Sequence, residues 1–352
     1  MTRQDLLLLV LLAAGLLGNG FATGLDRAFP PARGEPPTAE RVELGRLLFF
    51  DPVLSGDGTL SCGHCHRPDR AFSDGRPTAR GSGGAPLARN TPSLYNVAFK
   101  HRLFWDRRAG SLEEQVRGPL FSADEMGAEP GALLARLRAI PAYRERFARA
   151  FPPAGDEAVS VENLARAIAA FERTLVSDDS RYDRYARGQR DALTPAERRG
   201  LTLFRSVHTR CFECHRLPTF EAPLAMGVGV PSVDDGVGAL SGVEAQRGQF
   251  GVPTLRNVAL TAPYMHDGSL ATLEDVVAFY RKGGGRALGV DAARVHEHVR
   301  PFAISDREAS DLVAFLGALT DESARPEIPG QVPSGLPVLR APRLAAQPEE
   351  SR

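Results

Sequence analysis

Apolar side chains recur along most of this chain at the spacing of one helix face, not at the alternation of a strand. The longest such stretch covers residues 161–175, where Leu164, Ile168, Phe171 and Leu175 share one side. Other helices are marked by a Ser or Thr followed three residues later by an acidic residue. From these signals and from periodicity we expect helices after Ser111, Thr194, Thr272 and Ser305, and at residues 131–139 and 143–150. No alternating pattern is convincing, so the expected fold is mainly α.

A weak internal repeat divides the helical pattern into two halves. In each half a Gly is followed four residues later by a Phe on an amphipathic helix, as Gly45 and Phe49 and again as Gly200 and Phe204. The 352 residues also match the length of two ordinary domains. We therefore expect two similar domains at residues 25–175 and 176–322, and a mobile Pro-rich tail at 323–352.

Two long loops, at residues 67–90 and 218–251, are rich in Gly and Pro. Loops of this length in a compact chain are usually functional, so we expect them to border the chemical sites. The chain carries 43 basic and 43 acidic residues and has no net charge. It therefore lacks the basic excess typical of nucleic-acid binding, and no nucleic-acid partner is expected.

The first 24 residues are typical of a secretory signal. Arg3 precedes an apolar run at residues 6–17, and small residues follow up to Gly24. The run is shorter than the about 20 residues that span a bilayer, although an uncleaved anchor stays an alternative. We expect export, which means the periplasm in a Gram-negative cell.

All four cysteines fall in two copies of the pattern Cys-x-x-Cys-His. The residues are Cys62, Cys65 and His66 in the first copy, and Cys211, Cys214 and His215 in the second. This pattern marks covalent attachment of c-type haem, in which the two thiols bond the porphyrin and the histidine ligates iron. Disulfides or zinc are the alternatives, but a zinc ribbon would have to join motifs about 150 residues apart. We expect two covalently bound haems, one in each domain.

Several short motifs around these sites resemble the bacterial di-haem cytochrome c peroxidase and MauG-like family, from about residue 39 to 320. They are residues 54–58 (LSGDG), 89–94 (RNTPSL), 104–106 (FWD), 111–115 (SLEEQ), 118–120 (GPL), 125–127 (EMG), 253–258 (PTLRNV) and 263–268 (PYMHDG). Together they are highly specific. The resemblance implies two cytochrome c-like domains, with hydrogen peroxide reacting at the first haem and electrons entering at the second.

For the first haem, the resemblance implies an acid/base role for Glu125 and a place in the peroxide pocket for Gln115. Many relatives have a histidine in the loop after the first motif that blocks the iron until the protein is reduced. Residues 67–100 contain no histidine here, which resembles the permanently open relatives. His101, just beyond, is an alternative axial ligand.

For the second haem, the resemblance places the axial ligand fourteen residues after His266, at Tyr280. Peroxidase relatives have a methionine there, and MauG-like relatives have a tyrosine. A phenolate stabilises oxidised iron, so Tyr280 would lower the potential of this haem. Met265 and Met226 are the rival ligands, and a core tyrosine is the structural alternative.

The resemblance implies two further features between the haems. Trp105, the single tryptophan, matches a residue that couples the haems electronically, although a core tryptophan is the alternative. A calcium ion would be held by the side chain of Asn90 and the backbone carbonyls of Thr261 and Pro263.

Three functions remain open on the sequence. The leading one is a peroxidase that reduces hydrogen peroxide with electrons from a small cytochrome or cupredoxin. The second is a MauG-like oxidase that uses the same chemistry on residues of a partner protein, which Tyr280 favours. The third is a di-haem electron carrier without enzymatic activity. The resemblance also implies a homodimer, although nothing in the sequence identifies its interface.

Overall fold

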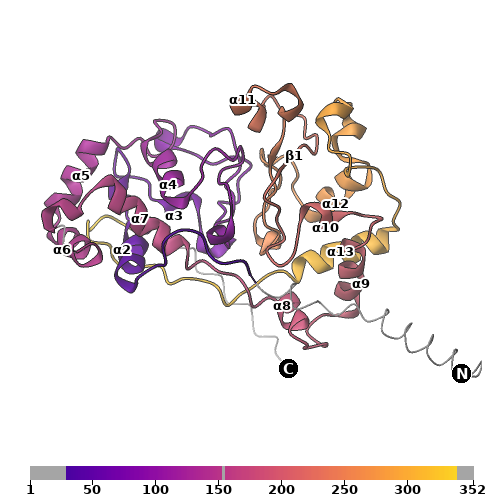
Figure 1. Ribbon diagram of the computed structural model, residues 1–352, viewed down its shortest axis with the longest axis horizontal. Helices are drawn as coiled ribbons and strands as arrows, with labels where there is room; N and C mark the ends of the chain where they lie inside the picture. The colour runs from indigo at the N-terminus through magenta and orange to yellow at the C-terminus, as the bar shows by residue number, and fades with distance from the viewer. Residues whose placement is uncertain (1–28, 153–154, 339–352) are drawn as a thin grey trace, which may run out of the picture.

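The computed structural model describes residues 29–152 and 155–338, so the proposed signal at residues 1–24 lies outside the described residues. The chain forms two largely helical lobes that lie side by side (Figure 1). We call the part from α2 to α7 the N-terminal lobe and the part from α8 to α13 the C-terminal lobe. The expectation of a mainly α fold is confirmed.

The regular elements start and stop close to the positions that the sequence signals predict. The N-terminal lobe contains α2 (Ala39–Phe50), α3 (Cys62–Cys65), α4 (Leu112–Phe121), α5 (Pro130–Ala139), α6 (Pro141–Ala150) and α7 (Val161–Glu172). The C-terminal lobe contains α8 (Arg181–Ala186), α9 (Pro195–Phe204), α10 (Cys211–Cys214), β1 (Ala225–Met226), α11 (Val237–Ser241), β2 (Phe250–Gly251), α12 (Leu273–Arg281) and α13 (Asp306–Gly317). Ser111, Thr194, Thr272 and Ser305 all cap their helices through the side-chain oxygen.

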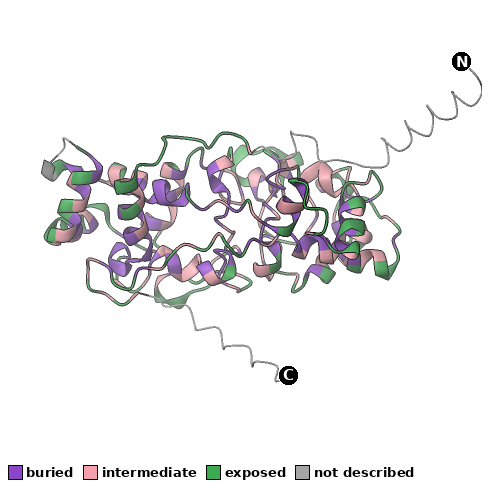
Figure 2. Ribbon diagram, turned by 90° about the horizontal axis from the view of Figure 1, so that it is seen from below, coloured by how far each residue is buried: buried purple, intermediate pink, exposed green. Residues whose placement is uncertain are grey.

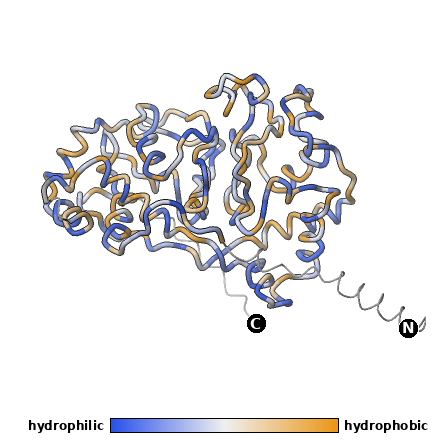
Figure 3. Tube along the Cα trace, in the orientation of Figure 1, coloured by the Kyte–Doolittle hydropathy of each residue, from blue (hydrophilic) through white to orange (hydrophobic). Residues whose placement is uncertain are grey.

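Hydrophobic and polar residues interleave along both lobes (Figure 3). Buried faces alternate with exposed ones around the helices (Figure 2). Among the described residues no helix has the length and apolar character needed to cross a bilayer.

Each lobe is built around one close helix pair, and the repeated glycines explain how. A Cβ on Gly45 of α2 would lie 1.9 Å from the carbonyl oxygen of Ala167 in α7. A Cβ on Gly200 of α9 would lie at the same 1.9 Å from the carbonyl oxygen of Asp311 in α13. Only glycine permits these approaches. The repeated glycine in the sequence therefore marks the same kind of helix contact in each lobe.

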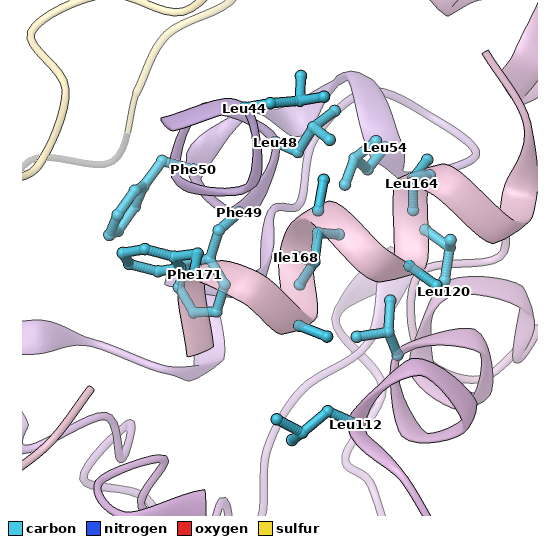
Figure 4. Packing of buried hydrophobic residues seen from close by; sticks show 14 of the residues in the cluster. Leu44, Leu48, Phe49, Phe50, Leu54, Leu112, Leu120, Leu164, Ile168 and Phe171 are labelled. Atoms are coloured by element: carbon cyan, nitrogen blue, oxygen red, sulfur yellow. The ribbon is translucent and has the colours of Figure 1, made fainter. Parts of the chain in front are cut away.

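A cluster of aromatic rings fills the core beneath each pair. In the N-terminal lobe, Phe49 of α2 lies 5.2 Å from Phe171 of α7 between ring centroids (Figure 4). In the C-terminal lobe, Phe204 of α9 lies 5.2 Å from Phe315 of α13. These rings are almost fully buried. The two cores therefore have the same plan.

The structure corrects two expectations. The long loop at 218–251 contains a short antiparallel ladder between Ala225–Met226 and Phe250–Gly251, which is too short to produce an alternating pattern. The segment from 323 to 338, expected to be part of a mobile tail, crosses from α13 back to the N-terminal lobe (Figure 1). It packs there through apolar side chains that include Ala324, Ile328 and Leu336.

Hydrogen bonds fix this returning segment. The hydroxyl of Ser334 donates to Oδ1 of the buried Asp51 at 2.6 Å, and the hydroxyl of Tyr95 donates to the carbonyl of Ala324 at 2.9 Å. The Pro-rich, polar composition of this segment predicted mobility, but its few apolar residues pack against the N-terminal lobe. Residues 339–352 of the expected tail lie outside the described residues.

Candidate haem sites

Each Cys-x-x-Cys-His motif forms a single helical turn, α3 or α10, that ends in the histidine. None of the four thiols forms a disulfide. Because the two motifs lie in different lobes, they cannot share one zinc ion. Burial raises the pKa of the Cys65 and Cys211 thiols to about 11 in each case, as expected for an apolar surrounding. This fits a site that receives the porphyrin ring.

Both histidines are oriented by a hydrogen bond from Nδ1 to a backbone carbonyl. Nδ1 of His66 donates to the carbonyl of Phe72 at 2.9 Å, and Nδ1 of His215 donates to the carbonyl of Phe220 at 3.1 Å. Phe72 and Phe220 have φ values of 63° and 54°, in the left-handed region that is strained for a bulky residue. This strained backbone aims each carbonyl at its histidine and leaves Nε2 to ligate iron.

Burial lowers the pKa of both imidazoles, for His215 to about 4. A neutral imidazole has the free lone pair that a metal needs. The two histidines therefore have the tautomer, the orientation and the charge state of proximal haem ligands.

A cavity of about 940 Å³, the first cavity, lies beside the first motif and between the lobes. Its walls include Cys65 and His66 of that motif. They also include three residues singled out in the sequence: Trp105, Gln115 and Glu125. Gln115 comes from α4 and Glu125 from the turn after it, so one short segment supplies both polar groups. The structure thus brings together residues that are up to 60 positions apart in sequence.

Glu125 is partly buried in this cavity. Burial raises the pKa of its carboxyl, and Arg108 opposes the shift. A carboxyl of raised pKa accepts a proton more readily than an exposed one and can pass it on, as an acid/base group must. His101 also borders the first cavity but is exposed, and its Nδ1 lies 3.2 Å from a guanidinium nitrogen of Arg33.

A second cavity, of about 250 Å³, lies beside the second motif. It is lined by Cys211, Cys214 and His215 and also by the three rival axial ligands, Tyr280, Met226 and Met265. Burial raises the pKa of Tyr280, so this phenol would ionise only with the help of a bound cation. The geometry brings all three candidates to one site without choosing among them.

Trp105 borders both cavities. Its indole Nε1 donates to the carbonyl of Asn90 at 2.9 Å in the N-terminal lobe. Its own carbonyl accepts from the N–H of Gly251 at 2.7 Å in the C-terminal lobe. The tryptophan is thus held by both lobes and borders both cavities, and its role in coupling the haems stays a prediction.

The residues predicted to hold calcium lie together at the second cavity. They are Asn90, Thr261 and Pro263. Nδ2 of Asn90 donates to the carbonyls of Arg76 and Pro77 at 2.8 and 3.2 Å. This arrangement reserves the amide oxygen for another partner and suits a hard cation. The calcium site itself stays a prediction.

Two features of the sites were not anticipated from the sequence. Arg89 forms an ion pair with Asp106 at 2.6 Å and a bidentate pair with Asp234 at 2.6 and 2.9 Å, which joins the lobes beside Trp105. The buried Glu172 also borders the first cavity. Arg89 opens the motif at residues 89–94, but no local signal indicates its ion pairs, and nothing near Glu172 in the sequence distinguishes it from a surface charge.

Two buried polar atoms fit a bound porphyrin with its acidic side chains. Oγ1 of Thr91 and Nε2 of His266 have no partner in the described chain, and both residues border the second cavity. The ring of His266 stacks on Phe250 at 3.8 Å, which fixes its direction. Buried polar groups are rarely left unpaired, so these atoms indicate a ligand at this position.

The fold and the two motif sites define a di-haem protein of the c type. The family model described as di-haem cytochrome c peroxidase matches residues 39–191. The methylamine utilization protein MauG of Methylorubrum extorquens is 38% identical over 303 residues, which cover 85% of this chain and 84% of that protein. The cytochrome c551 peroxidase of Pseudomonas aeruginosa is 36% identical over 306 residues, with coverages of 84% and 83%.

Among solved structures, a MauG-like protein associated with microbial copper homeostasis has a TM-score of 0.78 and 39% identity, and the match covers 85% of this chain and 95% of that one. The chain therefore belongs to the di-haem cytochrome c peroxidase and MauG family, and the resemblance stated from its motifs is confirmed.

Proposed function

We propose that this protein is a peroxidase that reduces hydrogen peroxide to water at the first cavity. The observation that carries the proposal is that Glu125 and Gln115 border the same cavity as His66. Electrons would enter at the second cavity from a small cytochrome or cupredoxin. The family is shown by the comparisons, whereas the substrate is inferred from the first cavity together with the resemblance, and the donor from the resemblance alone.

When bound, the two haems supply the iron that cleaves the O–O bond and the storage of oxidising equivalents. His66 and His215 would hold the irons, and the cysteines of each motif would hold the porphyrins. The carboxylate of Glu125 would take the proton from the peroxide oxygen that faces His66 and deliver it to the far oxygen. That oxygen leaves as water, and two electrons with two protons complete the reduction to two waters.

Gln115 and Trp105 would assist in different ways. The amide of Gln115 can orient the peroxide by a hydrogen bond, because it borders the same cavity as Glu125. Trp105 would shorten the electron path between the haems, because it is hydrogen-bonded to both lobes.

A MauG-like oxidation of a partner protein is the second candidate. It is favoured by Tyr280, which borders the second cavity, and by the likeness to MauG at an identity close to that of the peroxidase. Calcium at Asn90, Thr261 and Pro263, export to the periplasm and a homodimer are further parts of the proposal that follow from the resemblance.

Mixing the oxidised protein with one equivalent of hydrogen peroxide in a stopped-flow spectrophotometer tests the proposal. A fast change in haem absorption, followed by turnover with a reduced small cytochrome, is the expected result. A fast change without turnover, but with oxidation of a partner protein, would favour the MauG-like function. Reaction only after prior reduction would reveal a hidden axial ligand such as His101. Inertness in both redox states would support the electron carrier.

A further inference from the structure

Glu172 is a buried carboxyl group that has no part in the reaction proposed above. It is the last residue of α7, and only 4% of its surface is exposed. It borders the first cavity together with His66 and Cys65. Cys62, which attaches the porphyrin of this lobe, is close enough for the two charges to influence each other. The carboxyl therefore lies beside the first haem site.

No hydrogen-bond partner satisfies Oε2 of Glu172 among the described residues. The adjacent guanidinium of Arg173 is directed elsewhere, to Oε1 of Glu113 at 2.7 Å and to the carbonyl of Arg33 at 2.8 Å. A buried carboxylate oxygen without a partner adds to the desolvation cost of the charged form, so the surroundings of Glu172 favour its neutral form.

Three elements pack titratable groups around this carboxyl. They are Arg173, which follows α7 as its C-cap, Glu113 on α4 and the thiol of Cys62 on α3. On α2, which also packs against α7, Glu43 pairs with Arg46 and Arg41 pairs with Glu35. Burial raises the pKa of Glu172 to about 8, Arg173 opposes this shift and Glu113 adds to it.

Glu221 provides a contrast within the same cavity. It is also a mostly buried carboxyl, and burial raises its pKa as well, but Nζ of Lys100 lies 3.5 Å away and opposes this shift. The ion pair favours the charged form of Glu221, so its ionisation depends less on a change in nearby charge. Glu172 has no comparable ion pair, so its ionisation can respond to a change in nearby charge.

We propose that Glu172 is the redox-linked proton site of the first haem. Its unpaired, buried position beside the first motif makes its ionisation sensitive to the charge on the iron held by His66. When a one-electron reductant adds an electron there, the carboxylate takes one proton from solvent, and it releases that proton on reoxidation. The inference requires only the haem of the N-terminal lobe and holds for each of the candidate functions.

The test is a spectroelectrochemical titration of the first haem in the full haem-loaded protein, with dithionite and mediators, on both sides of pH 8. One proton per electron makes the midpoint potential fall by about 59 mV for each tenfold drop in proton concentration. In the unchanged protein we expect this slope above pH 8, where the carboxyl is ionised before reduction, and a nearly constant potential well below pH 8, where it is already protonated. Glu172→Gln should lose the slope. Glu221→Gln is the matched control and should keep the slope.

Two results would overturn the proposal: a slope that survives in Glu172→Gln, or one that disappears only in Glu125→Gln. The first would assign the proton to the porphyrin acid groups and the second to the peroxide pocket. If Glu172→Gln fails to bind haem, infrared difference spectra of the unchanged protein with isotope-labelled glutamate decide. A glutamate carboxyl signal on reduction that persists in Glu125→Gln and Glu221→Gln supports the proposal, and its absence refutes it.

Discussion

The first and second cavities share their attachment chemistry and the residues between them, such as Trp105, but differ in size and in the segments that cover them. In both, a carbonyl from a phenylalanine in the left-handed region orients the histidine, and a glycine-mediated helix pair supports the core. The first cavity is about 940 Å³ and the second about 250 Å³. The two halves thus share the oriented histidine and the helix pair that supports it. The residues on the opposite side of each cavity determine what that site can do.

The difference comes from the segments that cover each site. The turn after α4 places Glu125 and its neighbour Asp124 at the first cavity, with Arg108 close by. The second cavity is covered by α12, which presents Val276, Val277 and Tyr280. A polar, roomy site suits a small polar substrate, whereas a narrow apolar one suits electron transfer. Two predictions test this contrast at the cavities and two test the lobes that carry them, in order from the largest expected effect to the smallest.

Glu125→Gln should slow the reaction with peroxide at the first cavity and leave the second cavity unaffected. Loss of a positioned acid/base group costs about 10²–10⁴-fold in rate, and we expect that loss in the peroxide reaction followed by stopped flow. Because burial raises the pKa of Glu125, the unchanged protein should lose rate as the pH falls through that raised pKa. The variant should lack this acid limb.

Asp124→Asn is the control for that experiment, because Asp124 lies on the same turn but is exposed. It should react at nearly the unchanged rate. Equal loss in both variants would mean that the turn, not the Glu125 carboxyl, matters.

Arg256→Met should destabilise the C-terminal lobe by about 3–5 kcal/mol, because it leaves a buried charge unpaired. Arg256 is 1% exposed and binds both oxygens of Asp183 at 2.7 and 2.8 Å. Arg199→Met is the control, since its bidentate pair with Asp311 is as short but the Arg199 side chain is half exposed, and we expect a loss of about 0–1 kcal/mol. Urea unfolding measures both, and equal losses would contradict the role of burial.

The same pair has a defined pH dependence. Burial alone would raise the pKa of Asp183, but the hydrogen bonds from Arg256 outweigh it and lower the pKa. The contribution to stability is therefore present above the unfolded pKa of about 3.9 and is lost as the pH falls through the lower folded value. In Arg256→Met the buried carboxyl can take up a proton, so the deficit should shrink on acidification.

Tyr280→Phe should raise the potential of the second haem and leave the first unchanged. We expect a shift on the order of 0.1 V, which corresponds to about 2.3 kcal/mol, because a phenolate stabilises oxidised iron. Tyr264→Phe is the control, since Tyr264 borders the same cavity but its hydroxyl donates to the carbonyl of Val258. A shift in Met226→Leu or Met265→Leu instead would assign the ligand to that methionine.

Ser334→Ala should loosen the returning segment from the N-terminal lobe with the smallest effect, about 1 kcal/mol for one hydrogen bond. Asp51 keeps its bonds from the Tyr143 hydroxyl at 2.6 Å and the Val53 N–H at 2.9 Å. Ser310→Ala, at an exposed position on α13, is the control in the same thermal unfolding experiment. Equal stability of both variants would show that the segment contributes little.

The sequence by itself determined the local features of this protein. Capping residues and 3.6-residue periodicity located the long helices, because these signals act within a few residues. The two Cys-x-x-Cys-His motifs identified covalent haem attachment for the same reason, since one helical turn carries the whole pattern. The motifs around them identified the family.

Only the tertiary structure decided how distant segments meet. It placed Trp105 between two cavities, brought Glu172 to the first of them and returned residues 323–338 to the opposite lobe. It also gave the repeated glycines their meaning as points of helix contact. Burial, charge pairing and close approach depend on neighbours far along the chain, and a local pattern contains no record of those neighbours.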